Sequence, residues 1–359
     1  MKLKRYYPIF LLTGVLVLIQ LLTLVTGTAY YLTQLTMSAY YVIVAIGLSM
    51  VMGYAGQISL GQAGFFAIGG YTAAVLTTVD LTERIDRPFF ALLDKTGLLI
   101  HKVTLYGDSI VHLSPWISFI AALIIAGFIA YAIGVPVLRL KGHYLGMATM
   151  GFGIIIYRIV LGTGIFGEAD GISNVPEFPI LPGITIGGDF SIRIINYYAA
   201  WFFVILAMIL LINLVNSRAG RALRSLHGGE DAADAMGVDT ARYKVTVFVI
   251  GAVFAAAAGV FMTHYNGGIG PSESGVAKSV RYVAIVAVGG MANLWGVLIM
   301  GLVLNFLSLR GFFGVYDDAV FGVILVIIMM FFPDGLFQAS GLNRIRKQLS
   351  RLKGLIHGR

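Results

Sequence analysis

Ten runs of apolar residues, separated by polar or glycine-rich stretches, dominate the pattern of the chain. Most of them approach the roughly 20 residues that an α-helix needs to cross the hydrocarbon core of a bilayer. The predicted spans are residues 8–26, 36–53, 62–79, 115–136, 144–163, 197–216, 244–264, 280–290, 294–309 and 319–333. Long polar connections lie at 80–114, 164–196 and 217–243. The pattern predicts an all-α fold, a polytopic transmembrane helical bundle of about ten spans that include short or broken helices.

The composition supports a bilayer as the main solvent. Of the 359 residues 58% are hydrophobic and 12% are charged, whereas a soluble domain has roughly a quarter of its residues charged. The 45 glycines suit close packing between membrane helices. The absence of cysteine excludes disulfides, thiolate metal sites and cysteine nucleophiles.

The first apolar run follows three basic residues, Lys2, Lys4 and Arg5, and so has some features of a signal peptide. It is longer than the roughly 7–15 residues of a signal-peptide core, and no clean A-x-A cleavage site follows it. We therefore expect a retained first transmembrane helix.

The distribution of basic residues orients the ten spans. With the N-terminus inside, sixteen of the 25 Lys and Arg residues lie on the cytoplasmic side and eight outside, Lys278 and Arg281 among the eight. The remaining one, Arg158, lies within a span near its outer end. Because cytoplasmic loops are rich in Lys and Arg, we predict that both termini are cytoplasmic. This organisation gives a transmembrane domain over 1–343 and a basic cytoplasmic tail over 344–359.

Acidic residues gather on the two large outer loops. They are Asp80, Glu83, Asp86, Asp94, Asp108, Glu168, Asp170, Glu177 and Asp189. These loops are either docking surfaces for a periplasmic partner or ordinary solvated loops.

The segment 53–64 is too polar and too rich in glycine for a continuous transmembrane helix. Irregular backbone at membrane depth occurs only where protein or a water-filled cavity satisfies it, and transporters use such broken helices to bind solutes. Gln57, Ser59 and Gln62 are therefore candidates to line a translocation path, although a tight inner turn and interhelical hydrogen bonds are the simpler alternatives.

A weaker echo of this break lies at 289–296, where Asn293 is a further candidate for the path. Paired glycine-interrupted segments in two halves of a chain indicate an internally repeated transporter, so an internal repeat is a hypothesis here. By contrast, Gly251, Ala255 and Gly259 recur every four residues, which predicts a helix-packing face.

The inner segment 220–244 predicts two short helices around the pair Gly228 and Gly229. Asp231 and Asp234 would open the second helix, at the positive end of its dipole, and Gly237 would end it. A short amphipathic helix of this kind fits a groove of another protein, and the alternative is a solvated loop.

Residues 231–237 resemble the EAA signature of ABC importer permeases, with Asp231 in place of Glu, then Ala232, Ala233 and, after three more residues, Gly237. Other stretches are similar to the LIV (leucine/isoleucine/valine) family, and specifically to its M-type subunit. They are GYAGQISLGQAGFFAIGGY (53–71), LKGHYLGMAT (140–149), FFPDGLF (331–337) and the stretch 220–244. Together with Asp231, the outer loop 80–114 departs from the family pattern.

The resemblance implies a permease domain whose loop 217–243 couples to an ATPase. It marks as coupling residues Gly220, Arg221, Arg224, Asp231, Ala232, Ala233 and Gly237. It further implies a second permease, two ATP-binding subunits that use ATP and Mg²⁺, a periplasmic binding protein and a bacterial inner membrane. The chain contains no Gly-x-x-x-x-Gly-Lys-[Ser/Thr] nucleotide loop, so we expect no catalytic residue and no ATP hydrolysis here.

No cofactor, metal or nucleic acid is expected to bind the chain, since His143 and His264 lack a partner at metal-ligand spacing. The expected solutes are branched-chain amino acids, and the alternative within the same family is urea or a short amide. An ion-coupled secondary transporter is disfavoured because none of the ten spans contains Asp or Glu. No motif of an intramembrane enzyme is present.

Overall fold

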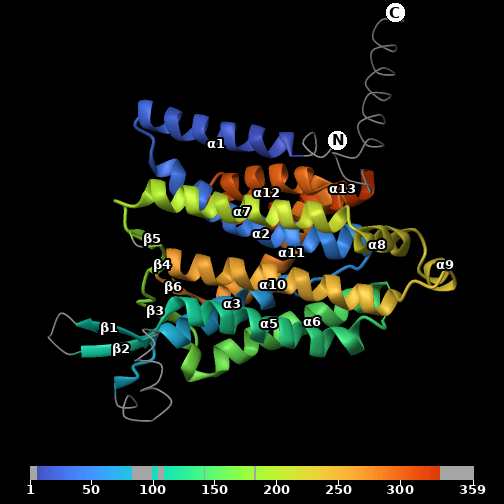
Figure 1. Ribbon diagram of the computed structural model, residues 1–359, viewed down its shortest axis with the longest axis horizontal. Helices are drawn as coiled ribbons and strands as arrows, with labels where there is room; N and C mark the ends of the chain where they lie inside the picture. The colour runs from blue at the N-terminus through green and yellow to red at the C-terminus, as the bar shows by residue number, and fades with distance from the viewer. Residues whose placement is uncertain (1–5, 83–98, 104–108, 141, 182, 332–359) are drawn as a thin grey trace, which may run out of the picture.

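The computed structural model describes residues 6–82, 99–103, 109–140, 142–181 and 183–331, and Figure 1 shows these as a bundle of roughly aligned helices. The basic tail predicted over 344–359 and the acidic residues Glu83, Asp86, Asp94 and Asp108 lie outside the described residues. The all-α membrane bundle predicted from the sequence is confirmed.

Each predicted span coincides with a helix. The helices are α1 (Tyr7–Val25), α2 (Tyr30–Ser49), α3 (Gln62–Thr78), α5 (Pro115–Val137), α6 (His143–Gly162), α7 (Arg193–Val215), α10 (Thr240–Asn266), α11 (Val276–Gly289), α12 (Leu294–Leu309) and α13 (Asp317–Phe331). Helix α2 begins six residues before the predicted span 36–53 because its first turns carry polar and aromatic residues that still continue the helix.

Seven membrane-crossing segments are long and apolar enough to span a bilayer, within the part of the chain that the structure describes. Helices α3, α11 and α12 are shorter, with 17, 14 and 16 residues. At 1.5 Å per residue α11 covers only about 21 Å, less than the roughly 30 Å of a hydrocarbon core. Two stretches outside the α-helices precede α3 and α11 and make up part of the difference: 55–61, which is irregular, and 267–275, which contains the short 3-10 helix η5 (Pro271–Ser274).

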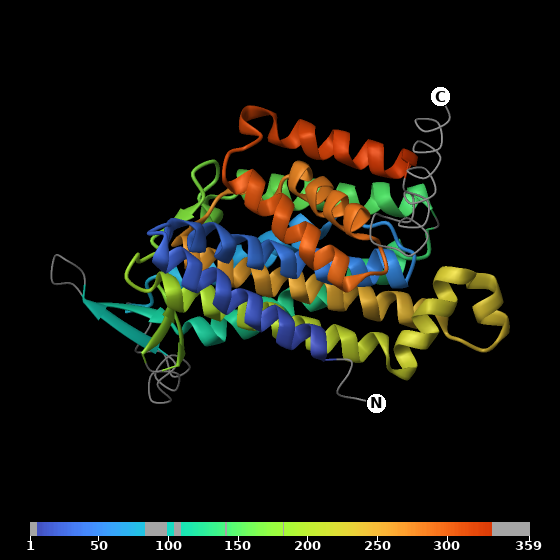
Figure 2. The same ribbon diagram turned by 90° about the horizontal axis from the view of Figure 1, so that it is seen from above.

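The two ends of the bundle differ in structure. At one end lie three small antiparallel sheets, formed by β1 (Leu99–Val103) with β2 (Ser109–Leu113), β3 (Ile172–Ser173) with β6 (Gly268–Ile269), and β4 (Phe178–Leu181) with β5 (Ile184–Ile186). We call this the sheet end. At the other end α8 (Arg218–Gly228) and α9 (Glu230–Ala235) project beyond the bundle, as Figure 2 shows.

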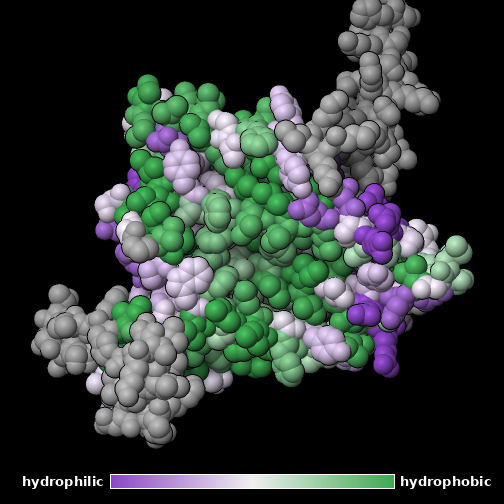
Figure 3. All heavy atoms as spheres, viewed as in Figure 1, coloured by the Kyte–Doolittle hydropathy of each residue, from purple (hydrophilic) through white to green (hydrophobic). Residues whose placement is uncertain are grey.

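Figure 3 shows an apolar belt across the middle of the bundle and polar residues gathered around α8 and α9. Figures 1 and 2 show that α1 begins, and α13 finishes, toward the α8–α9 end. The first and the last described helix therefore begin and end, respectively, at the same end of the bundle.

Helices α2, α3 and α10 form the centre of the bundle, and α1, α5, α6 and α13 lie around it with apolar faces exposed. The backbones of α3 and α10 touch at glycines: a Cβ on Gly259 would lie 2.1 Å from the carbonyl oxygen of Phe66, and one on Gly69 would lie 2.2 Å from that of Ala256. Gly251 packs in the same way against Gly47 of α2. The predicted packing face of α10 is therefore confirmed, and its small residues let α10 pack closely against both α2 and α3.

The loop between α6 and α7 is held down at the sheet end by an aromatic cluster. Phe178 of β4 is fully buried against Phe261 of α10 and Trp116 of α5. His264 is buried too, and its Nδ1–H donates to the carbonyl oxygen of Pro176 at 2.6 Å. His264 thus ties α10 to this loop.

The contact between α3 and α10 generates a stability prediction. We expect Gly259→Ala to lower the unfolding free energy by about 1–3 kcal/mol, because the added methyl group must push the two backbones apart. The matched control is Gly151→Ala on α6, where an added Cβ meets no atom within 4 Å. Thermal unfolding of the detergent-solubilised protein measures both, and equal midpoints for the two variants would contradict the packing described here.

Candidate functional site

The predicted break at 53–64 is a true interruption of the helical backbone. Helix α2 ends in the π-turn η2 (Met50–Tyr54), in which the N–H of Ala55 donates to the carbonyl oxygen of Met50. Gly56 then takes a left-handed conformation with φ +66°, and the chain runs without helix to Gln62. The glycine is required at this point because residues with a Cβ rarely adopt that conformation.

Side chains from two other helices satisfy the backbone of the break. The N–H of Leu60 donates to Thr149 Oγ1 of α6 at 3.0 Å, and the N–H of Ala63 donates to Ser279 Oγ of α11 at 3.2 Å. A hydrocarbon environment offers no such partners, so irregular backbone at membrane depth needs them from protein. The break is therefore held in place by side chains of α6 and α11, while Gly56 and Ile58 within it are exposed.

The three polar candidates in the break, Gln57, Ser59 and Gln62, are all buried, with at most 4% of each residue exposed. Their five side-chain polar atoms have no hydrogen-bond partner among the residues that the structure describes. The simpler alternative, that they hydrogen-bond between helices, is therefore wrong for these residues. Buried polar groups without a partner are rare and indicate a site that exchanges partners, such as a route for a polar solute.

Asn293 has a different position from the other three candidates. It lies at the N-terminus of α12, where its Oδ1 accepts from the N–H of Gly296 at 3.1 Å. It also lines a small cavity of about 280 Å³ with Tyr54, whose hydroxyl donates to the carbonyl oxygen of Ala292. Asn293 thus caps α12 beside Tyr54, the last residue of η2. It does not lie in the break with Gln57, Ser59 and Gln62.

The segment 289–296, interpreted from the sequence as an echo of the break, is a tight capped turn between α11 and α12. Gly290 has φ +92°, and the N–H of Asn293 donates a hydrogen bond to the carbonyl oxygen of Gly290, which closes the turn. The interruption that precedes a short α-helix in the second half of the chain lies at 267–275 instead, and it includes β6 and η5. Glycine content alone drew attention to the wrong segment, because glycines serve turns as well as breaks.

The stretch 267–275 brings charged residues to membrane depth. Glu273 and Lys278 form an ion pair of 2.9 Å, and both contact the hydroxyl of Tyr41 on α2. Tyr41 lies eleven residues from the start of α2, about 16 Å along the helix. Lys278 is therefore not the outer-loop residue that the sequence predicted, because α11 begins at Val276 deep within the bundle.

Arg281 also belongs to α11 and not to a loop. Its guanidinium pairs with Asp317 at 2.6 Å and Asp318 at 2.7 Å in the first turn of α13, and it donates to Ser308 of α12. Sequence reasoning missed the acidic partners, since the predicted span began at residue 319. The two ion pairs tie the first half of α11 to α2 and α13.

At the opposite end, α7 passes into α8 through a tight corner. Ser217 caps α8 by accepting from the N–H of Gly220, and a Cβ on Gly220 would lie 2.1 Å from the carbonyl oxygen of Val215. Arg224 Nη2 donates to the same carbonyl oxygen at 2.7 Å. Gly220 and Arg224, two of the predicted coupling residues, therefore set the angle between α7 and α8.

The second short helix, α9, is tied to α10. Glu230 forms an ion pair with Lys244, and Asp234 accepts a hydrogen bond of 2.7 Å from the hydroxyl of Thr240. Asp234 thus lies at the end of α9 and not in its first turn, which corrects the sequence prediction; Asp231 does lie in the first turn. Gly237 follows with φ +81° and ends the helix as predicted.

The remaining candidate coupling residues divide by exposure. Ala233 is buried, whereas Arg221 in the first turn of α8 and Asp231, Ala232 and Gly237 in or just after α9 are exposed, and we call these four residues the tip. Met236, with 84% of its surface exposed, joins them and was missed by sequence reasoning. The available signal in the sequence was an apolar methionine within the EAA-like stretch, directly before Gly237. The tip therefore presents a small, mixed polar and apolar surface on a framework held by buried contacts.

The comparisons with known proteins agree with these features. Residues 30–329 match the model of the family described as the permease component of branched-chain amino acid transport systems. The LivM permease of the high-affinity branched-chain amino acid transport system of Salmonella typhimurium is 30% identical over 344 residues, covering 90% of this chain and 72% of that protein. The Escherichia coli permease LivH is 27% identical over 332 residues, covering 88% and 98%. No solved structure matches.

The contrast between paired and unpaired polar groups at the break gives a second stability prediction. Thr149→Val should lower the unfolding free energy by about 1–3 kcal/mol, because it leaves the buried N–H of Leu60 without a partner. Gln62→Leu should leave the unfolding midpoint unchanged or raise it, since its side-chain amide makes no hydrogen bond to lose. Thermal unfolding of the purified protein tests both; a large loss for Gln62→Leu would show that its amide serves the fold.

Proposed function

Because the chain belongs to the family of permease components of branched-chain amino acid transport systems, we propose that it is the M-type permease subunit of an ATP-driven ABC importer. It forms half of the path by which branched-chain amino acids, delivered by a periplasmic binding protein, cross a bacterial inner membrane. The observation that carries the proposal is the similarity to LivM over 90% of the chain.

The coupling loop supports this assignment. The tip formed by Arg221, Asp231, Ala232 and Gly237 is exposed, while Arg224 and Glu230 anchor it to α7 and α10. A short helix held on a rigid frame suits docking into a groove of a partner protein. We propose that two ATP-binding subunits bind ATP and Mg²⁺ and dock here, and that a second permease completes the membrane core.

The break between α2 and α3 is the proposed part of the translocation path. Gln57, Ser59 and Gln62 carry unpaired polar atoms inside an apolar bundle, which is the property a polar solute requires of its route. Asn293 adjoins the α8–α9 end of this segment through Tyr54.

Solute identity is testable with the assembled importer. Purification of this chain from its native membrane should recover a second permease and two ATPases. In proteoliposomes with the binding protein, ATP should drive uptake of leucine, isoleucine and valine, and excess urea or acetamide should not compete. Uptake that needs no ATP would identify a secondary transporter, and competition by urea would identify the amide-transporting alternative. Gln62→Leu should lower the uptake rate without loss of stability.

The coupling loop gives a separate prediction. Arg221→Glu and Gly237→Pro should leave membrane insertion intact and abolish ATP-dependent uptake, because the first reverses an exposed charge at the tip and the second distorts its backbone. Arg310→Glu, just after α12, is the matched control, since it reverses an exposed charge that contacts Tyr30 and Tyr31 and lies outside the coupling loop. Unchanged uptake in Arg221→Glu and Gly237→Pro would contradict the docking role of the loop.

A further inference from the structure

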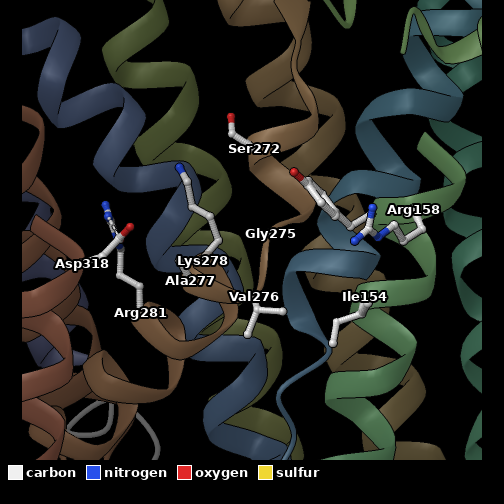
Figure 4. A pocket seen from close by; sticks show the side chains of 10 residues that line it. Ile154, Arg158, Ser272, Gly275, Val276, Ala277, Lys278, Arg281 and Asp318 are labelled. Atoms are coloured by element: carbon white, nitrogen blue, oxygen red, sulfur yellow. Dashed lines mark hydrogen bonds and ion pairs between the residues drawn. The ribbon is translucent and has the colours of Figure 1, made fainter. Parts of the chain in front are cut away.

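A cavity of about 500 Å³ lies between α6, the start of α11 and the start of α13. Its lining includes Ile154, Arg158, Val276, Ala277, Lys278 and Asp318, and Figure 4 shows their side chains around the shared space. We call it the outer cavity, because Arg158 and Asp318 belong to the turns of α6 and α13 nearest the sheet end. Its volume falls within the roughly 300–1,000 Å³ of small-molecule sites.

The outer cavity contains three cationic side chains, and two of them are neutralised within the chain. Lys278 pairs with Glu273, and Arg281 pairs with Asp317 and Asp318. Arg158 forms no ion pair with any residue that the structure describes. Arg158 is therefore the cationic side chain of the lining that has no ion-pair partner among the described residues, although the two aspartates on Arg281 bring the net charge of these six groups to zero. A charged side chain within a membrane helix is costly and commonly marks a route for solutes.

The rest of the lining is suited to an aliphatic group. Ile154, Val276 and Ala277 supply hydrocarbon surface, and the apolar part of the wall is larger than the polar part. A single guanidinium beside an aliphatic wall matches the carboxylate and side chain of an aliphatic amino acid. A neutral amide such as urea has neither group, so its carbonyl oxygen would accept hydrogen bonds from Arg158 without the ion pair that a carboxylate forms.

The outer cavity also adjoins the proposed path. Lys278 in its wall precedes Ser279, whose hydroxyl accepts from the N–H of Ala63 at the start of α3. Gln62 is the residue before Ala63 and is among the buried, unpaired candidates. A solute that leaves the outer cavity toward the α8–α9 end therefore meets the break between α2 and α3 next.

We propose that the outer cavity is an entry site for an aliphatic amino acid, in which Arg158 binds the carboxylate and the wall of Ile154, Val276 and Ala277 receives the side chain. The proposal rests on the importer function proposed above and adds the place and the chemistry of solute entry. Arg158 is well suited to this role because a guanidinium binds a carboxylate through two parallel hydrogen bonds. Lys278 and Arg281, held in their own pairs, keep the start of α11 in position.

The absence of cysteine from the chain allows a direct test of the cavity. Ile154→Cys lines the outer cavity, and Ile155→Cys, its neighbour on α6, is exposed but lies outside the lining. In right-side-out vesicles that hold the whole importer, each variant is treated with an anionic or a cationic methanethiosulfonate reagent. Mass spectrometry of this chain then gives the rate of labelling.

We expect Ile154→Cys to be labelled from outside and Ile155→Cys, which lies outside the lining, to react at least about tenfold more slowly. The anionic reagent should react faster than the cationic one at Ile154→Cys, and this ratio should fall by about tenfold when Arg158→Gln is added. A cysteine at position 154 that is not labelled, or a ratio independent of Arg158, would overturn the proposal. If Arg158→Gln fails to insert into the membrane, the ratio of the two labelling rates in Ile154→Cys with Arg158 intact still reports the charge of the cavity.

Uptake in the same vesicles separates the two proposals. Arg158→Gln should lower leucine uptake about tenfold or more, Arg158→Lys should restore part of it, and Arg139→Gln should have no effect. If the unmodified importer takes up leucine with ATP and Arg158→Gln does so equally well, the entry site is overturned while the importer function stands, and Arg158 serves lipid phosphate groups instead. If the unmodified importer takes up no leucine, the importer function itself is overturned.

Discussion

The need to satisfy backbone polar groups inside an apolar solvent governs the centre of this protein. Hydrocarbon offers no partner for a free N–H, so a helix can be interrupted only where a neighbouring helix supplies one. Thr149 of α6 and Ser279 of α11 do this for the break between α2 and α3. Four helices must therefore meet at one place, and the close contact of α3 with α10 through Gly259 makes that meeting possible.

Charge follows the same constraint. Ionised groups at membrane depth are stable when they are paired; Glu273 with Lys278 joins the stretch 267–275 to α11, and Arg281 with Asp317 joins α11 to α13. These pairs fix α11, whose start faces both the break and the outer cavity. Arg158 is outside this scheme, so its charge remains available to a ligand. The distribution of paired and unpaired charge thus separates residues that hold the bundle from one that can recognise a solute.

The loop at the opposite end is connected to the centre through α10. Glu230 of α9 pairs with Lys244 near the start of α10, and further along the same helix Gly251 and Gly259 pack against α2 and α3. A displacement of α9 by a docked partner would therefore act on the helix that borders the break. This continuity is the property that an importer requires if ATP hydrolysis outside the membrane is to open a path within it.

Hydropathy and glycine patterns along the sequence predicted all ten membrane helices and the interruption at 53–64. They also predicted that the inner loop forms two short helices divided near Gly229, and that Gly237 ends the second of them. These features depend on neighbours in sequence, because apolar length and local backbone freedom decide them. The sequence could not show that Glu273 contacts Tyr41, 232 residues away, or that Asn293 caps a turn while Gln62 stays unpaired. Such pairings are decided by which helix faces pack together, and that choice is made only in the tertiary structure.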